Sequence, residues 1–229
     1  MPDPPNIDNG RLPSLRYSQA RPLIRSGDLL LFRSRGLKGQ ALQIAGRGRY
    51  THAAMAVWWG RPAELPYQDG NGILCVCETV EGIGGRIMPL SRYVAEYPGT
   101  IEVFSINTHA FRSYDRWGAV EWALRNIPGV RYGTWTIVRI ALSHLPIFRW
   151  FIRPDTDNVS VAKRRPVCST ARAMADRIGG GVDPVPHLAD EWCEPSDLAK
   201  SLLYRQKFRL VPDGPRGEGL EEGQTTDAE

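Results

Sequence analysis

Short apolar runs broken by glycine and proline dominate the chain after residue 27. They are rich in β-branched and aromatic residues, which is typical of strands that are buried in a sheet. The pattern predicts strands at residues 28–32, 51–59, 73–80, 85–88 and 101–106, and a last strand at 208–211 that closes the sheet.

Helical signals are concentrated in the second half of the chain. They predict helices at residues 37–45, 113–127, 167–178 and 196–203. Ser113 is a suitable N-cap for the second of these helices, and Pro128 stops it. Pro166 and the glycine run after Ile178 bound the third helix, and Ser196 caps the fourth. Strands that cluster early and helices that cluster late predict an α+β fold.

Length and composition fit one globular domain with two polar ends. The chain has 229 residues, 42% of them hydrophobic, and shows no repeat with a period of about 20–50 residues. Residues 1–21 are rich in proline, and residues 213–229 are rich in acidic residues and glycine. We expect both ends to be disordered, because neither can bury enough apolar surface to offset its ordering entropy. The folded unit is then residues 22–212.

Charge is unevenly distributed. Residues 213–229 hold one arginine and six acidic residues, net −5, so the overall charge of +4 leaves +9 on residues 1–212. A basic body of this kind favours contact with an anionic polymer or a membrane surface, or is simply a solvated face. Nucleic acid is not an expected partner, because no nucleic-acid recognition module is present. The oligomeric state stays open.

Neither a secretory signal nor a long apolar segment is visible, so we expect a cytoplasmic protein, or one delivered by a phage particle or a secretion apparatus. The cysteines at 75, 77, 168 and 193 do not form a disulfide framework. Cys75 and Cys77 also have no second cysteine or histidine pair nearby, so neither a metal nor a cofactor is expected.

Three residues have the chemistry of a nucleophilic site. Cys168 opens the predicted helix at 167–178, where unpaired N–H groups and the helix dipole favour a thiolate. His52 begins a strand beside small residues and suits a general base. Glu78 lies on an apolar strand face and needs a partner, which His52 would supply; Asp69 and Glu81 remain alternatives. A purely structural role also stays open for each of the three.

The motifs around these residues resemble a known family over most of the folded unit. GDLLLF, YTHAAMAV, VCETVEGIGGRIMPLSRYV, GVRYG and VCSTARAMA resemble the permuted papain-like hydrolases, the YiiX and YaeF branch of the NlpC-like superfamily. The resemblance implies a circularly permuted papain-like fold, in which a mostly antiparallel sheet or half-barrel packs against the helix that bears the nucleophile.

The resemblance also implies roles for individual residues. Cys168 would be the nucleophile, His52 the general base and acid, and Glu78 the residue that orients the imidazole. Tyr132 would line the site and, with Ser169 at the start of the helix, is a candidate to stabilise the oxyanion. The chain departs from the family pattern at Thr170 and Ala171, the second and third residues after the nucleophile, and in an insertion or lid at residues 133–166.

We therefore expect a thiol hydrolase that cleaves an amide bond through an acyl-enzyme, in a peptide such as a cell-wall (peptidoglycan) peptide. A lipid acyl amide or ester hydrolase, or an acyltransferase, is the alternative, and the apolar, arginine-bearing run at 137–152 is its support. A non-catalytic module that binds a ligand on the same fold is the third hypothesis.

Overall fold

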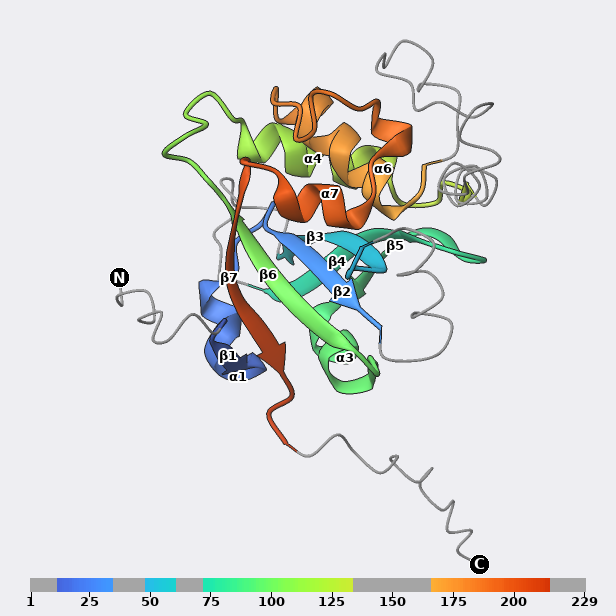
Figure 1. The fold of residues 1–229 in the computed structure, drawn as a ribbon. Coiled ribbons are helices and arrows are strands. Elements are labelled where there is room, and N and C mark those ends of the chain that lie inside the picture. Colours follow the sequence, from blue (N-terminus) through green and yellow to red (C-terminus); the bar gives the residue numbers. More distant parts are fainter. Residues whose placement is uncertain (1–11, 35–47, 61–71, 134–165, 215–229) are drawn as a thin grey trace, which may run out of the picture.

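The computed structural model describes residues 12–34, 48–60, 72–133 and 166–214. The predicted helix at 37–45, Asp69, nearly all of the expected insertion at 133–166, and most of the acidic tail lie outside these residues. The described residues form an α+β fold around one seven-stranded sheet, with the strand order β1-β7-β6-β2-β3-β4-β5 (Figure 1).

Neighbouring strands pair antiparallel throughout this sheet, except β1 and β7, which are parallel. The strands are β1 (Ser14–Arg16), β2 (Leu29–Arg33), β3 (His52–Trp59), β4 (Ile73–Val80), β5 (Gly84–Pro89), β6 (Thr100–Ile106) and β7 (Tyr204–Val211). The α+β prediction is thus confirmed, with an open and mostly antiparallel sheet.

Helices cover both faces of the sheet (Figure 1). One face carries α4 (Arg116–Asn126), α6 (Cys168–Met174) and α7 (Pro195–Lys200), and the other carries α1 (Tyr17–Ala20) and α3 (Leu90–Glu96). Single helical turns complete the set: η1 (Arg21–Leu23), the π-helical turn η3 (Ala175–Gly179) and η4 (Asp190–Trp192). No helix in the described part of the chain is both long and apolar enough to span a bilayer.

Strand β3 is buried on both of its faces, which explains its nearly uninterrupted apolar sequence. Met55 and Val57 pack against α4 and α6, whereas Ala54, Ala56 and Trp58 pack against α1 and α3. Alternate side chains of a strand point to opposite faces of the sheet. His52 therefore shares its face with α3, although Cys168 belongs to a helix on the opposite face.

Helix α6 is held against α4 by a close approach of two backbones. A Cβ atom on Gly118 of α4 would lie 2.3 Å from the carbonyl oxygen of Gly179, and one on Gly179 would lie 2.4 Å from the carbonyl oxygen of Gly118. A side chain at either position would force the two segments apart. The glycine pair thus fixes the distance between α4 and the continuation of α6.

A buried ion pair fixes α6 over the sheet. Arg172 is 2% exposed, and its Nε and Nη2 donate to Asp176 at 3.0 and 2.9 Å. Nη2 also donates to the carbonyl of Gly27 at 2.8 Å. The hydroxyls of Tyr114, at 2.6 Å, and Tyr204 donate to the Asp176 carboxylate. These contacts join α6 to the residues before β2 and α4 and to the start of β7.

The N-terminal segment corrects the prediction that residues 1–21 are disordered. Within that range, β1 pairs with β7 through Ser14 opposite Arg209, and α1 follows it. The Ser18 hydroxyl and N–H donate to the Asp213 carboxylate at 2.7 and 2.9 Å, which places the first residue of the predicted acidic tail against α1. Pairing between segments this far apart in sequence leaves no local signal.

Several element boundaries also differ from the sequence prediction. Asp115, rather than Ser113, caps α4, since its carboxylate accepts from the Gly118 N–H. Helix α7 begins at Pro195 and ends at Lys200, because the chain must reach β7 at Tyr204. The predicted helix at 167–178 is divided into α6 and the π-helical turn, and α3 was not predicted.

Replacing Arg172 with methionine is expected to lower the free energy of unfolding by about 3–5 kcal/mol, because the buried Asp176 carboxylate loses its counter-charge. Urea denaturation measures this loss. Arg125→Met is the matched control: Arg125 also pairs with a carboxylate one helical turn away, but it is 74% exposed, so its loss should stay within about 1 kcal/mol. Equal losses in the two variants would contradict the structural role of Arg172.

Candidate active site

The site forms where β3 and β4 separate. The ladder between them extends from Met55 opposite Cys77 to Trp59 opposite Ile73, and it does not include the first residues of β3 or the last residues of β4. The N–H of Ala53 lies beyond this ladder and donates to the sulfur of Cys168. The gap between the two strands thus lets a residue of α6 meet the edge of β3.

His52 and Glu78 meet across this opening on the α3 face of the sheet. Both point to that face, and their positions are diagonal neighbours on adjacent strands. His52 Nε2 lies 2.6 Å from Glu78 Oε2. The side chain of Glu78 has no exposed surface, whereas that of His52 is 19% exposed. The carboxylate therefore fixes the orientation of the ring from the buried side.

The sulfur of Cys168 forms a hydrogen bond with the imidazole of His52. Since Nε2 faces Glu78, Nδ1 is the nitrogen left for the sulfur. Burial by itself would raise the pKa of Cys168, but the charge and hydrogen bond of His52, together with the N–H groups of Ala53 and Ser169, lower it. The thiolate is thus favoured at lower pH than for an ordinary cysteine.

Just as His52 lowers the pKa of Cys168, Cys168 raises the pKa of His52. Burial opposes a charge on the ring, but the Cys168 thiolate and the Glu78 carboxylate raise the pKa of His52 to about 10. Burial would likewise raise the pKa of Glu78, yet His52 and the hydrogen bonds from Tyr93 and Arg86 lower it below its usual value. The three groups shift one another in the same sense, toward thiolate, imidazolium and carboxylate.

Tyr132 reaches the sulfur from the segment that follows α4. Its pKa is raised, first by burial and then by the charge of Cys168, to which its hydroxyl hydrogen-bonds. The segment is held against β5 by Gly85, whose N–H donates to the carbonyl of Val130 at 2.7 Å. A Cβ on Gly85 would lie 1.6 Å from the carbonyl oxygen of Ile127, so only glycine fits there.

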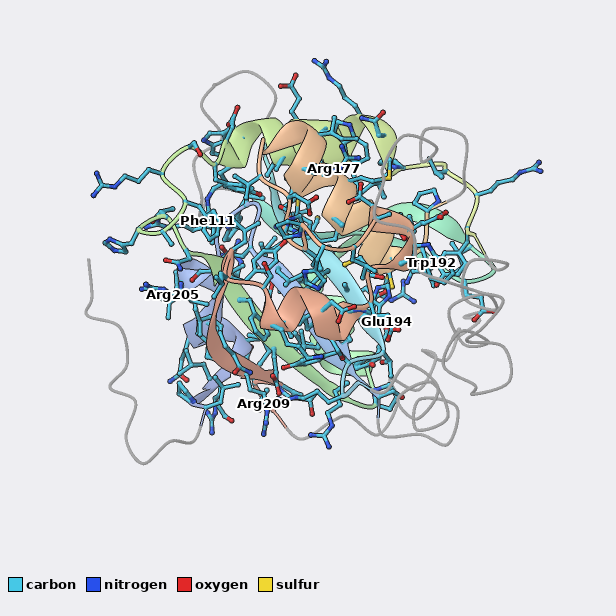
Figure 2. The ribbon with its side chains drawn as sticks, turned by 45° about the horizontal axis from the view of Figure 1, so that its top comes forward. Phe111, Arg177, Trp192, Glu194, Arg205 and Arg209 are labelled. Atoms are coloured by element: carbon cyan, nitrogen blue, oxygen red, sulfur yellow. The ribbon has the colours of Figure 1, made fainter. Side chains whose placement is uncertain are left out.

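Ser169 contacts the Cys168 sulfur through its backbone N–H and not through its hydroxyl. Its hydroxyl donates to the carbonyl of Cys193 at 2.6 Å, which ties α6 to the segment before α7. That segment, which contains Trp192, runs beside α6 (Figure 2). The Ser169 N–H instead bonds to the Cys168 sulfur. As an oxyanion candidate, Ser169 is thus limited to its N–H group.

The structure therefore brings together Cys168, His52, Glu78 and Tyr132. Of the acidic residues that the structure describes, Glu78 is the one that faces the imidazole. Glu81 lies on the exposed turn after β4, and its charge acts on Tyr132. Asp69 lies outside the described residues.

Sequence reasoning missed two members of the site, Arg86 and Tyr93. Arg86 Nε donates to Glu78 Oε1 at 2.8 Å, and the Tyr93 hydroxyl donates to the same oxygen. A signal for Arg86 was present, because a hairpin around the glycine-rich turn pairs Glu78 directly with Arg86. Tyr93 carries no comparable signal, since its contact depends on how α3 folds back onto the sheet.

Comparisons with known proteins identify a similar fold. No protein-family model matches the sequence, and no curated protein matches it. Among solved structures, the chain is similar to YiiX from Escherichia coli O157:H7, which is called a metalloprotein and DUF1105. The TM-score is 0.53 at 16% sequence identity, and the match covers 82% of this chain and 98% of that one. The chain thus has a YiiX-like fold.

Replacing Glu78 with glutamine is expected to lower the pKa of His52 from about 10, by about one unit or more, because the amide keeps the shape of the side chain but loses its charge. A proton NMR titration of the His52 ring measures the change. Glu81→Gln removes a charge from the nearby exposed turn and should leave the titration in place. Identical curves for wild type and Glu78→Gln would contradict the assigned role of Glu78.

Proposed function

We propose that this chain is a thiol hydrolase that cleaves an amide bond through an acyl-enzyme on Cys168. The observation that carries the proposal is the bonded row of Cys168, His52 and Glu78, in which Nε2 of His52 lies 2.6 Å from the carboxylate. A nucleophile, a base and a residue that orients the base are the parts that covalent acyl transfer requires.

The first half of the reaction follows from the charges of these groups. The Cys168 thiolate attacks the carbonyl carbon and forms a carbon–sulfur bond, while the negative charge moves to the carbonyl oxygen. We assign that oxygen to the N–H of Cys168 at the start of α6 and to the Tyr132 hydroxyl, which already faces the sulfur. His52 then gives its proton to the amine, and the carbon–nitrogen bond breaks.

The second half releases the acyl group. The neutral His52 accepts a proton from water, the hydroxide attacks the thioester, and the thiolate leaves as the carboxylic acid forms. Throughout, Glu78 holds the imidazole so that Nδ1 faces the sulfur. When the ring is neutral, Glu78 also favours the tautomer in which Nε2 carries the proton. Glu78 itself neither gains nor loses a proton.

A circularly permuted papain-like architecture is part of the proposal. Its support is the chain order His52, Glu78, Cys168, with the strand-borne histidine before the cysteine helix, together with the YiiX-like fold. In papain-like enzymes that are not permuted, the cysteine helix precedes the histidine strand. Fold similarity supports the architecture but not the chemistry, which depends on the site itself.

For the substrate we propose peptide-type amides, with cell-wall peptides as the first class to test. Exposed basic side chains such as Arg205 on β7 (Figure 2) suit an anionic wall polymer. Lipid amides and esters are the comparison class in the same test. The run at 137–152 that supported them lies outside the described residues.

Metal binding, suggested by the name of the YiiX protein, does not fit the residues of this site. Both oxygens of Glu78 accept hydrogen bonds from protein groups, and both nitrogens of His52 are engaged. Among the described residues, no group of three or more histidine, cysteine, aspartate or glutamate side chains is arranged to hold an ion.

We expect Cys168→Ala to abolish cleavage of the peptide substrate and His52→Ala to lower kcat/KM by about a thousandfold or more. Wild-type activity should fall on the acid side as Cys168 becomes protonated, and again near pH 10 as His52 loses the proton that the leaving amine needs. Mass spectrometry of an acid-quenched reaction should find the acyl group on Cys168.

The control for these variants is Cys75→Ala, which removes a buried thiol from the middle of β4 and should retain activity. Cleavage that survives in Cys168→Ala would contradict the mechanism. Binding of peptides or lipids without turnover or adduct, in a protein whose Cys168 is unreactive, would instead favour the non-catalytic module.

A further inference from the structure

The buried carboxylate of Glu78 is held from behind by two side chains. Its Oε2 faces His52, while its Oε1 accepts from Arg86 Nε at 2.8 Å and from the hydroxyl of Tyr93. Arg86 Nη2 in turn donates to the Tyr93 hydroxyl at 2.7 Å. Glu78, Arg86 and Tyr93 thus form a closed triangle of hydrogen bonds on the side of Glu78 away from the thiol.

Separate elements bring these two side chains to Glu78. Arg86 is the direct partner of Glu78 in the β4–β5 ladder, so the register of the hairpin sets its position. Tyr93 comes from α3, where its ring packs on Phe32 with 5.2 Å between ring centroids. The ring of Phe32 also lies 5.1 Å from that of His52. The rings of Tyr93 and His52 thus both pack on Phe32, and this packing places the Tyr93 hydroxyl and the His52 imidazole at the two oxygens of Glu78.

The charge balance shows why such a support is needed. A carboxylate without solvent contact prefers its neutral form, and a neutral Glu78 would no longer favour a protonated His52. Arg86 supplies a permanent positive charge next to Glu78 and is itself 28% exposed. Groups that can carry opposite charges thus alternate from Arg86 through Glu78 and His52 to Cys168.

We propose that Arg86 and Tyr93 are positioning residues that keep Glu78 ionised and aimed at His52, so that the reactivity of Cys168 depends on two side chains that do not contact it. The inference rests on the proposed function and extends it by one layer. Arg86 acts through its charge and its planar fork, whereas Tyr93 acts by filling the second acceptor site of Oε1.

The test is the labelling rate of Cys168 by iodoacetamide as a function of pH, followed by peptide mass spectrometry. In Arg86→Gln we expect the acid limb of the profile to move upward by about one pH unit, a roughly tenfold slower rate at a given pH on that limb. Tyr93→Phe should move it in the same direction by less. Arg86→Lys keeps the charge but not the fork, so its profile should lie between those of wild type and Arg86→Gln.

Two matched variants separate positioning from general effects. Arg92→Gln removes a positive charge from α3, where Arg92 is 63% exposed and pairs with Glu96. Tyr97→Phe removes a hydroxyl from the same helix, where Tyr97 also packs on Phe32 but bonds to Thr51 and Ser34. Both should retain the wild-type profile, and circular dichroism should show that every variant is folded.

The outcomes distinguish this inference from the proposed function. A wild-type profile that titrates like an ordinary thiol would contradict both. A wild-type profile shifted to low pH that stays unchanged in Arg86→Gln and Tyr93→Phe would overturn the positioning role alone. Equal shifts in the Tyr93 and Tyr97 variants would also overturn it, because loss of a hydroxyl from α3 would then be sufficient.

Discussion

A carboxylate with no solvent contact is the constraint on which the rest of this structure depends. Removing the Glu78 charge from water costs several kcal/mol unless it gains counter-charges and hydrogen bonds. Three donors meet that need, from β3, β5 and α3. Because one of them is His52, satisfying the carboxylate also fixes the imidazole that faces Cys168. The same hydrogen bond therefore serves both the stability of the buried carboxylate and the proposed chemistry at Cys168.

The fold supplies the geometry in which this row of charges can form. Strands β3 and β4 separate near Ala53, which frees its N–H for the Cys168 sulfur. The buried pair of Arg172 and Asp176 and the close contact of Gly118 with Gly179 hold α6 in place over the sheet. Cys168 is therefore presented at the opening between β3 and β4, while His52 and Glu78 lie on the opposite face.

Local patterns predicted strands that overlap all the described ones except β1, and the main residues of the candidate site, for a physical reason. Strand 73–80 was predicted at its observed bounds, since it is apolar, β-rich and bounded by glycine. The face on which Glu78 lies follows from the two-residue period of a strand, and the structure brings it to His52. That period needs no knowledge of the tertiary fold.

The features that sequence reasoning missed depend on contacts between distant segments. Strand β1 is formed by pairing with β7. Helix α3 follows Pro89 and has no side-chain N-cap, so its start leaves no local sequence signal. The role of Tyr93 appears only once α3 packs on the sheet. Ser169 illustrates the same limit, because the partner of its hydroxyl is the carbonyl of Cys193, at the far end of another loop.

The most direct test of the central claim is the ionisation of Cys168 itself. The ultraviolet absorbance of the thiolate, taken as the difference between wild type and Cys168→Ser, is measured as the pH is raised from 5 to 10. The account predicts that the thiolate is already present at pH 6 and that this early ionisation is lost in His52→Ala. A thiolate that forms only near or above pH 8.5, with or without His52, would contradict it.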